Sequence, residues 1–371
     1  MKRVALDGMA IRERFGVARV LREVIPLLAA SEDLDCVVFA TREGLELLGP
    51  VDAEVVAVGG VPKSVWEQTG LPWHARRAGA EIIYSHSECA PAWGPPVLLH
   101  VPEDPYARWE TGRATTAKER LRRRYQRLVT PRSVRRAPLL VTSCQSIASA
   151  LRARFGPGLP KIVVVPLGVD TKAFYPDEGP PAEGSVFHLG SPSPRDQTDL
   201  VVRAYREAVS MVPDLPDLVV AGELGELGAS IHAMAKGSGI SSRVHLQGRV
   251  SDEELRRCYA HAALCVQPAR YEGFGLQPLE ALACGAPLIV IEEPAVHEVV
   301  GEAAVVVAEQ SDAALAKAMV ELWSGGARRG RLRKAGPLRA AMFPWQLTAS
   351  RLRDLLLAPA SPAPKAEVLA D

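Results

Sequence analysis

Short apolar segments alternate with segments of helical period along most of the chain. Residues 2–6 are predicted as a first strand. Hydrophobic side chains then recur every three or four residues, which predicts an amphipathic helix over residues 16–30. Further segments rich in β-branched residues, each predicted as a strand, follow at residues 36–41, 53–58, 80–85, 96–101, 138–143 and 161–166. This alternation predicts a mainly parallel sheet with helices on both faces.

The pattern restarts after a proline- and glycine-rich stretch at residues 167–184, which we interpret as a linker. The strands predicted beyond it lie at residues 185–190, 217–222, 243–248, 263–268 and 286–291. The sequence therefore predicts an α/β protein with two doubly wound, Rossmann-like parallel-sheet domains, residues 1–168 and 169–344. Ligands of such sheets bind beyond the carboxyl ends of the strands, so we expect the domains to face each other across a cleft that holds the active site. The Pro/Ala-rich residues 358–371 are predicted to be disordered.

Length and composition agree with a two-domain protein and exclude few classes of function. The chain has 371 residues, which suits two domains, and a formal net charge of +1, which does not favour nucleic acid or an anionic surface as partner. One exception is the arginine-rich stretch at residues 118–136. We interpret it as a solvated helix face. The alternative is contact with a phosphate-rich acceptor or peripheral contact with an anionic membrane.

The cysteines and the hydropathy pattern indicate a cytoplasmic protein. None of the six cysteines has a partner at C-x-x-C spacing, which argues against a zinc site or a disulfide framework. The amino-terminal residues soon meet charges and do not form a signal peptide, and no run of about 18 apolar residues predicts a membrane-spanning helix.

Residues 267–299 contain the most specific candidate for a ligand-binding site in the sequence. Glu272 and Glu280 are separated by seven residues, and the glycine at Gly275 followed by Pro278 predicts a helix that begins near Leu276. Unpaired amides at that helix start offer a site for a phosphate. Glu280, one turn inside, is then within reach of a ribose diol, and Glu272 faces the group beyond the phosphates. The alternative is a glycine-rich surface turn with two solvated glutamates.

Here the sequence resembles family 4 of the nucleotide-sugar glycosyltransferases, which have the two-domain GT-B fold. Residues 250–290 are similar to that family's E-x7-E segment almost residue for residue, and residues 163–176 resemble its interdomain stretch. Residues 66–87 and 123–146 are similar to its amino-terminal domain, and residues 345–357 to the helix that crosses back to that domain. The resemblance implies a metal-independent, retaining transferase that moves a sugar from a nucleoside diphosphate sugar to an acceptor hydroxyl, in polysaccharide or glycosylated-metabolite biosynthesis.

The resemblance also implies roles for individual residues. Glu272 contacts the donor sugar and stabilises charge at its anomeric centre, and Glu280 binds the ribose hydroxyls. The remaining donor-binding residues implied by position are Phe274, Gly275 and Leu276 for the diphosphate, Gly248, Arg249 and Val250 for the base, and Gly16 and Arg19 in a glycine-rich loop of the amino-terminal domain.

No protein nucleophile, cofactor or metal is expected beyond the donor co-substrate. In the family's mechanism the departing phosphate deprotonates the acceptor, and the protein supplies position and charge. His100, at the end of a predicted strand, occupies the place of a histidine near the reacting centre, although such a residue is also commonly structural. Asp33 and Asp35 form an Asp-x-Asp pair, but they precede a strand, so we predict a turn and no metal site.

The match fails in the loop after residues 185–190. The family carries an arginine and a lysine there, both on the diphosphate, whereas this chain has Ser191 and Asp196. Arg195 is adjacent and could place its guanidinium on the phosphates, helped by the hydroxyls of Ser191 and Ser193. Otherwise the leaving group carries less charge, or the protein has lost transfer activity and is a binding or partner protein. A sugar phosphorylase or an epimerase on the same fold is a further alternative.

The acceptor is the part of the reaction that the sequence specifies least. Residues 102–120, which include Tyr106 and Trp109, are our candidate for a loop on the acceptor side. We expect the acceptor to be a small molecule or a glycan.

Overall fold

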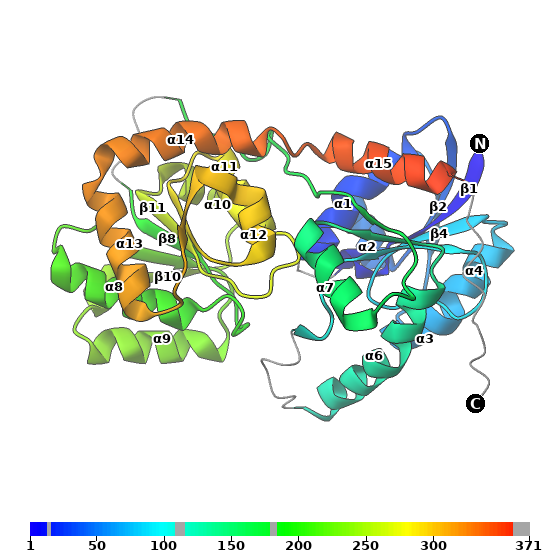
Figure 1. Cartoon of the computed structure of the whole chain (residues 1–371), viewed down its shortest axis with the longest axis horizontal. Helices are drawn as coiled ribbons and strands as arrows, with labels where there is room; N and C mark the ends of the chain where they lie inside the picture. The colour runs from blue at the N-terminus through cyan, green and yellow to red at the C-terminus, as the bar shows by residue number, and fades with distance from the viewer. Residues whose placement is uncertain (13–15, 108–115, 179–183, 359–371) are drawn as a thin grey trace. The chain divides into compact units, whose positions relative to one another are not determined.

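The computed structural model describes residues 1–12, 16–107, 116–178 and 184–358, and it divides into two compact α/β units (Figure 1). Unit 1 comprises Met1–Gly168 and the segment that begins at Trp345, and unit 2 comprises Val169–Pro344. Trp109 and the tail from residue 359 lie outside the described residues.

Unit 1 is built on a parallel sheet that has seven strands within the described residues. Their order is β3-β2-β1-β4-β5-β6-β7. The bounds are β1 Lys2–Asp7, β2 Leu34–Ala40, β3 Glu54–Ala57, β4 Ile82–His86, β5 Val97–Val101, β6 Leu139–Thr142 and β7 Ile162–Val164. The chain winds outward in one direction from β1 and in the other from β4, so the carboxyl ends of these two neighbours form the switch point of the sheet, where ligands of this fold class bind.

Helices cover both faces of this sheet. They are η1 Met9–Arg12, α1 Gly16–Ala29, α2 Arg42–Leu48, α3 Lys63–Val65, the π-helical turn η2 Trp66–Gly70, α4 Leu71–Arg77, α6 Ala117–Arg136, α7 Gln145–Phe155 and α15 Trp345–Leu357. The predicted amphipathic helix is confirmed as α1. Helix α15 packs against α1 (Figure 1), and the Thr348 hydroxyl donates to the carbonyl of Pro166 at 2.7 Å.

Unit 2 repeats the architecture with six parallel strands in the described part, in the order β10-β9-β8-β11-β12-β13. The strands are β8 Val186–Leu189, β9 Leu218–Ala221, β10 Val244–Gly248, β11 Leu264–Gln267, β12 Leu288–Ile291 and β13 Ala304–Val307. The helices are α8 Thr198–Met211, α9 Glu226–Gly237, η3 Ser241–Arg243, α10 Asp252–His261, α11 Leu276–Ala283, α12 Pro294–Val300, η4 Gly301–Ala303, α13 Asp312–Ser324 and α14 Gly326–Ala340. The switch point lies between β8 and β11.

The predicted fold class is confirmed, because both units are Rossmann-like parallel sheets, whose buried strands read as continuous apolar runs. Two details differ from the sequence analysis. Asp35 does not belong to a turn: β2 begins at Leu34, and Asp35 pairs with Arg3 at 2.6 Å. Residues 169–174 are not a loose linker either, since Val169 and Phe174 are buried in unit 2.

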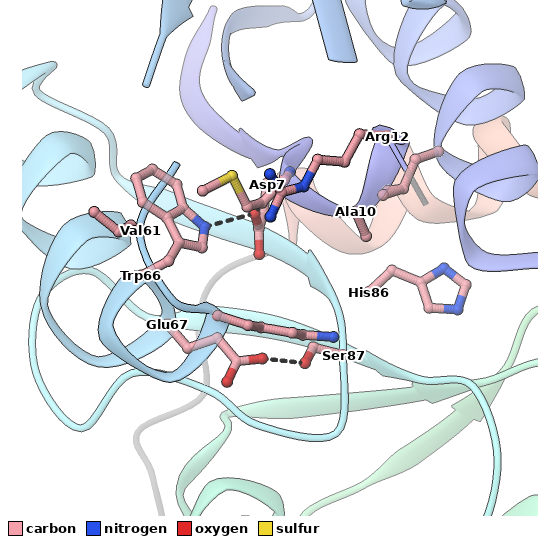
Figure 2. A pocket seen from close by; sticks show the side chains of 11 residues that line it. Asp7, Ala10, Arg12, Val61, Trp66, Glu67, His86 and Ser87 are labelled. Carbon is pink, nitrogen blue, oxygen red and sulfur yellow. Dashed lines mark hydrogen bonds between the residues drawn. The ribbon is translucent and has the colours of Figure 1, made fainter. Parts of the chain in front are cut away.

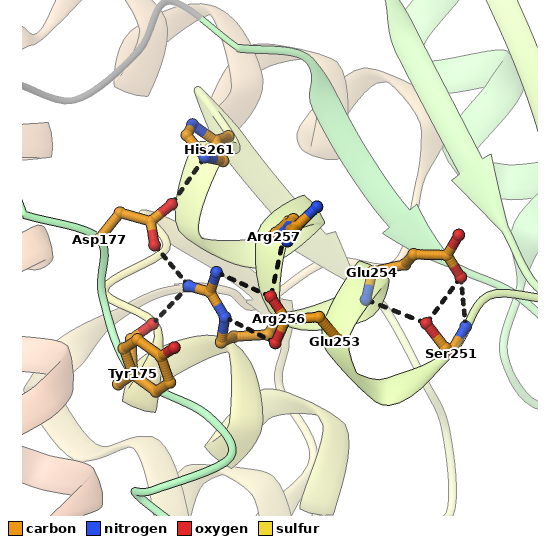
Figure 3. A network of polar contacts seen from close by, with 8 residues as sticks. All are labelled: Tyr175, Asp177, Ser251, Glu253, Glu254, Arg256, Arg257 and His261. Atoms are coloured by element: carbon orange, nitrogen blue, oxygen red, sulfur yellow. Dashed lines mark hydrogen bonds and ion pairs between the residues drawn. The ribbon is translucent and has the colours of Figure 1, made fainter.

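The chain that follows Phe174 is fastened to α10 by an ionic network (Figure 3). The Arg256 guanidinium donates to Asp177 at 2.6 Å and lies 4.4 Å from the ring centre of Tyr175, and His261 Nε2 lies 2.7 Å from the second Asp177 oxygen. The hydrogen bond from Arg256 lowers the pKa of Asp177. A capping box between Ser251 and Glu254 fixes the start of the same helix.

No helix in the described part of the chain has both the length and the apolar character that crossing a bilayer requires.

Candidate donor site

Two loops meet at the switch point of unit 2, one after β8 and one after β11. The Arg270 amide donates to the Arg195 carbonyl at 3.0 Å, which ties the loops together. Beneath them the buried ring of His188 bridges the β11 carbonyl of Val266 at 2.8 Å and the Thr198 hydroxyl at 3.0 Å. Burial lowers the pKa of His188, so the imidazole is neutral, and its two hydrogen bonds connect β8, α8 and β11.

Arg195 lies between two carboxylates at this point. Its Nε atom is 3.7 Å from Glu272 Oε1 and 3.9 Å from Asp196 Oδ1. Turn hydrogen bonds set the loop path, because the Ser193 amide donates to the Ser191 hydroxyl at 3.0 Å and the Arg195 amide to the Ser193 hydroxyl at 3.3 Å. The structure therefore brings together Arg195, Ser191 and Glu272, three residues that the sequence analysis selected from two distant stretches.

Helix α11 begins where the glycine and proline pattern predicts. Gly275 has φ +99°, a left-handed conformation that favours glycine, and Leu276 opens the helix. A side chain at Gly275 would also come within 3.3 Å of Val296. Glu280 is 5% exposed, so the alternative of a surface helix with two solvated glutamates is wrong.

Phe274 lies beside this helix start, but its ring faces inward. It packs edge-on against Phe343, with ring centres 5.9 Å apart. Phe274 thus anchors the loop by its side chain, and only its backbone is left for a ligand.

Two further residues of this loop cluster were missed by the sequence analysis. Tyr271 has φ +58°, an uncommon conformation for a bulky residue, and its amide donates to Glu293 Oε2 at 3.0 Å. Burial raises the pKa of Glu293. This hydrogen bond holds the strained turn just before Glu272, and nothing in the spacing of the sequence indicates it.

Glycines bring three strand ends of unit 2 close together. A side chain at Gly222 would lie 2.0 Å from the Gly190 carbonyl oxygen, and the Gly222 amide donates to the Gly248 carbonyl at 2.6 Å. Gly248 ends β10, followed by the exposed Arg249 and the half-buried Val250. Of these glycines, only Gly248 was predicted as a site residue.

Other predicted site residues belong to unit 1. Gly16 opens α1, and Arg19 is half-buried in the first turn of that helix. Tyr106, in the candidate acceptor-side loop, packs against Phe155 with ring centres 5.7 Å apart.

His100 is completely buried in unit 1. Its Nδ1 atom is 3.1 Å from the Tyr84 hydroxyl and its Nε2 atom 3.2 Å from the Ser143 hydroxyl. Burial lowers its pKa well below the usual value, which makes the ring neutral. His100 has no exposed surface for a substrate here. Its ring stacks on His86, with ring centres 4.2 Å apart, and His86 lines a small cavity.

This cavity, about 30 Å³ in volume, lies at the switch point of unit 1 (Figure 2). Asp7, at the end of β1, accepts hydrogen bonds from Trp66 Nε1 and from the Ser85 hydroxyl, both at 2.9 Å. The ring nitrogens of His86 are buried and have no hydrogen-bond partner among the described residues. Burial lowers the pKa of His86 to about 3.

Glu67 is the second carboxyl group at the cavity, and the sequence analysis missed it. It accepts from the Ser87 hydroxyl at 2.8 Å and from the Tyr125 hydroxyl at 2.9 Å. Burial raises its pKa to about 7 despite these bonds and nearby Lys63. The π-helical turn that contains Glu67 buries both Trp66 and Glu67, and such turns are frequent at functional sites. Within the described residues, no group of His, Cys, Asp or Glu side chains forms a metal-binding cluster.

Comparison with known proteins settles the family. A model described as Glycosyltransferase Family 4 matches residues 16–173, and one described as Glycosyl transferases group 1 matches residues 183–325. The chain belongs to the family 4 glycosyltransferases. Their GT-B fold is also that of a sucrose-phosphate synthase from Thermosynechococcus elongatus, which is 18% identical, has a TM-score of 0.76 and aligns over 96% of this chain and 98% of its own.

Among curated relatives, an MMP α-(1→4)-mannosyltransferase of Mycolicibacterium hassiacum is 32% identical over 59% of this chain and 54% of its own length. A GDP-mannose-dependent α-(1-6)-phosphatidylinositol dimannoside mannosyltransferase of Mycobacterium tuberculosis is 30% identical over 53% of this chain and 52% of its own length. The chain thus spans about half the length of the curated relatives that it matches.

Proposed function

We propose that this protein is a retaining glycosyltransferase that moves a sugar from a nucleoside diphosphate sugar to an acceptor hydroxyl, in polysaccharide or glycosylated-metabolite biosynthesis. The observation that carries the proposal is the position of Arg195, 3.7 Å from Glu272 at the switch point of unit 2. The Arg195 cation and the start of α11 suit the negative diphosphate of such a donor. The Glu272 carboxylate suits the sugar, which gains positive charge as the bond to the phosphate breaks.

In this proposal the diphosphate is held by the amides of Phe274, Gly275 and Leu276 and by the Arg195 guanidinium. Glu280 accepts hydrogen bonds from the ribose hydroxyls, and Glu272 stabilises positive charge at the anomeric carbon. The bond from the anomeric carbon to the phosphate oxygen breaks, and a bond to the acceptor oxygen forms on the same face. The acceptor proton passes to the departing phosphate, so the step needs no protein nucleophile and no metal.

The other predicted donor residues keep supporting roles. Gly248, Arg249 and Val250 frame the base at the end of β10, and Ser191 adds a hydroxyl beside the phosphates. Gly16 and Arg19 remain proposed donor contacts from α1. His100 is proposed as a positioning residue, because it contacts Tyr84, Ser143 and His86 rather than solvent.

The test is Arg195→Ala, measured as release of nucleoside diphosphate over a panel of donors and acceptors. GDP-mannose is the first donor to try, since one relative is named for it. Loss of a cation on a developing phosphate charge is expected to lower kcat about 100- to 1000-fold. The control is Arg270→Ala, an exposed arginine on the facing loop. Unchanged turnover in Arg195→Ala would remove Arg195 from the mechanism.

A second candidate function is a donor-binding protein without transfer activity. Asp196 favours it, because a carboxylate that is 6% exposed and 3.9 Å from Arg195 competes with phosphate for that cation. Thermal shift separates the two functions. Stabilisation by GDP or UDP without diphosphate release for any acceptor supports the binding protein, whereas release that depends on the acceptor supports the transferase.

A further inference from the structure

Helix α6 buries a mainly polar face against unit 1 and exposes its two leucines to solvent. Leu121 and Leu128 are 69% and 63% exposed, although leucine in a surface helix normally faces the core. The two are seven residues apart, so they lie on nearly the same line along the helix. The buried positions of α6 are instead Gln126, Thr130, Ser133 and Val134.

Specific hydrogen bonds fix this orientation. The Ser133 hydroxyl accepts from the Ala90 amide at 2.9 Å, and the Thr130 hydroxyl lies 3.5 Å from the Cys89 sulfur. Thr130 is nine residues from Leu121, which places it about 180° around the helix axis. The leucines therefore point away from unit 1 because the opposite face of the helix is bonded to residues 89–90.

Cations surround the two leucines. The helix contains eight arginines, one lysine and one glutamate, a net charge of +8 in a chain whose total is +1. The single glutamate, Glu119, pairs with Arg123 at 2.8 Å. Arg124, Arg132 and Arg135 are exposed and lie within about 60° of the leucine line.

The basic helix α14 of unit 2 gives a useful contrast. Its Arg333 donates to the Ala262 carbonyl at 2.7 Å, and its Arg339 donates to the Val299 carbonyl at 2.8 Å. Those guanidinium groups serve the fold of unit 2. On α6, Arg135 likewise donates to the Phe155 carbonyl at 3.0 Å, whereas Arg124 and Arg132 make no ion pair within the described residues.

We propose that the exposed face of α6, centred on Leu121 and Leu128, docks on an anionic lipid surface. Lipid headgroups complement the net charge of the helix, and the leucines reach into the boundary between headgroups and acyl chains. A nucleic acid or another soluble polyanion would satisfy the arginines but would gain little from two exposed leucines. The combination of arginines and exposed leucines thus favours an anionic bilayer as the partner of this face. The sequence alone favours a face exposed to solvent.

The experiment is co-sedimentation of the full chain with phosphatidylcholine vesicles, with and without about 30 mol % of phosphatidylglycerol, at about 0.1 M salt. The wild type is expected to bind only the anionic vesicles. The pair Leu121→Ser and Leu128→Ser should lower the partition coefficient about tenfold, through lost apolar insertion. The pair Arg124→Gln and Arg132→Gln, both on the leucine side of the helix, should lower it about fivefold for each charge.

Matched controls carry the same changes elsewhere. The pair Leu47→Ser and Leu338→Ser removes two leucines outside α6 that are 48% and 73% exposed, and the pair Arg328→Gln and Arg351→Gln removes two charges from exposed positions outside α6. Both controls should partition within about twofold of the wild type. All replaced side chains are exposed, and an unchanged melting temperature verifies folding.

Three results would overturn the proposal: no binding to anionic vesicles, equal binding to neutral vesicles, or binding that the leucine pair does not alter. In the last case a single-stranded RNA competitor that displaces the vesicles would assign the face to a polyanion.

Discussion

The buried carboxyl group of Glu67 is expected to make the free energy of unfolding of unit 1 depend on pH. The substitution Glu67→Gln should remove this dependence. Glu67 is 3% exposed, and burial raises its pKa from the ordinary 4.5 to about 7. The folded protein therefore holds this proton more tightly than the unfolded chain does. The resulting stability is fully present below about pH 4.5 and is lost as the pH rises through about 7.

The size of the effect follows from the difference of about 2.5 pKa units. That difference corresponds to about 3 kcal/mol in all, of which about 2.5 kcal/mol falls between pH 5 and pH 8. Glu67→Gln keeps the shape of the side chain and an oxygen for the Ser87 or Tyr125 hydroxyl, but it has no proton to lose. The variant should thus gain about 2.5 kcal/mol relative to the wild type between these pH values.

The assay is urea unfolding at pH 5, 6, 7 and 8, followed by the fluorescence of the unit 1 tryptophans, which include Trp66 and Trp73. Other titrating groups cancel in the difference between variant and wild type. Glu46→Gln, at an exposed position of α2, controls for the change in net charge. A difference between Glu67→Gln and wild type that stays constant within about 0.5 kcal/mol from pH 5 to pH 8 refutes the reasoning.

Three other predictions test the donor site. Gly222→Ala should lower the free energy of unfolding by about 3 kcal/mol in urea denaturation, because its methyl group would lie 2.0 Å from the Gly190 oxygen. The control Gly237→Ala, with open space around its Cβ, should cost nothing measurable. Glu280→Gln should weaken nucleoside diphosphate sugar binding about 10- to 100-fold in calorimetry, through loss of charge-assisted hydrogen bonds, and unchanged affinity would contradict the ribose role. Diphosphate release should persist in excess EDTA, and a loss that magnesium restores would contradict the metal-free mechanism.

The fold could be predicted because its signals are local and repeated. Each buried parallel strand reads as an apolar run, and glycine and proline mark the ends of helices, as at Gly275 and Pro278. The start of α11 follows from these rules together with the resemblance of the E-x7-E segment. The strand order that places β8 beside β11 was not predicted and comes from the structure. This order brings Arg195 and Glu272 close together, because both follow strands at the switch point.

The residues that the sequence did not reveal depend on side-chain direction. His100 lies next to the last residue of β5, close to the expected strand end, yet the Tyr84 and Ser143 hydroxyls hold its ring inside the unit. Glu67 points inward because a π-helical turn shifts the helical phase just before α4. The left-handed backbone of Tyr271 depends on a hydrogen bond to Glu293, which lies 22 residues further along the chain. Periodicity carries no information on such contacts.

Helix α6 is the case in which the sequence pattern leaves the inward face of a helix undetermined. The arginine-rich sequence predicts a solvated face but does not identify the residues that pack against unit 1. The face that the fold uses consists of Gln126, Thr130 and Ser133, whose side chains bond to residues 88–90. Turning the leucines inward would leave those buried polar groups without partners, at a cost of about 1–3 kcal/mol each. That cost exceeds what a half-buried leucine would gain, so the polar face decides the orientation. The exposure of the leucines is then a consequence of the fold, and an apolar surface among arginines is what a lipid headgroup layer can bind.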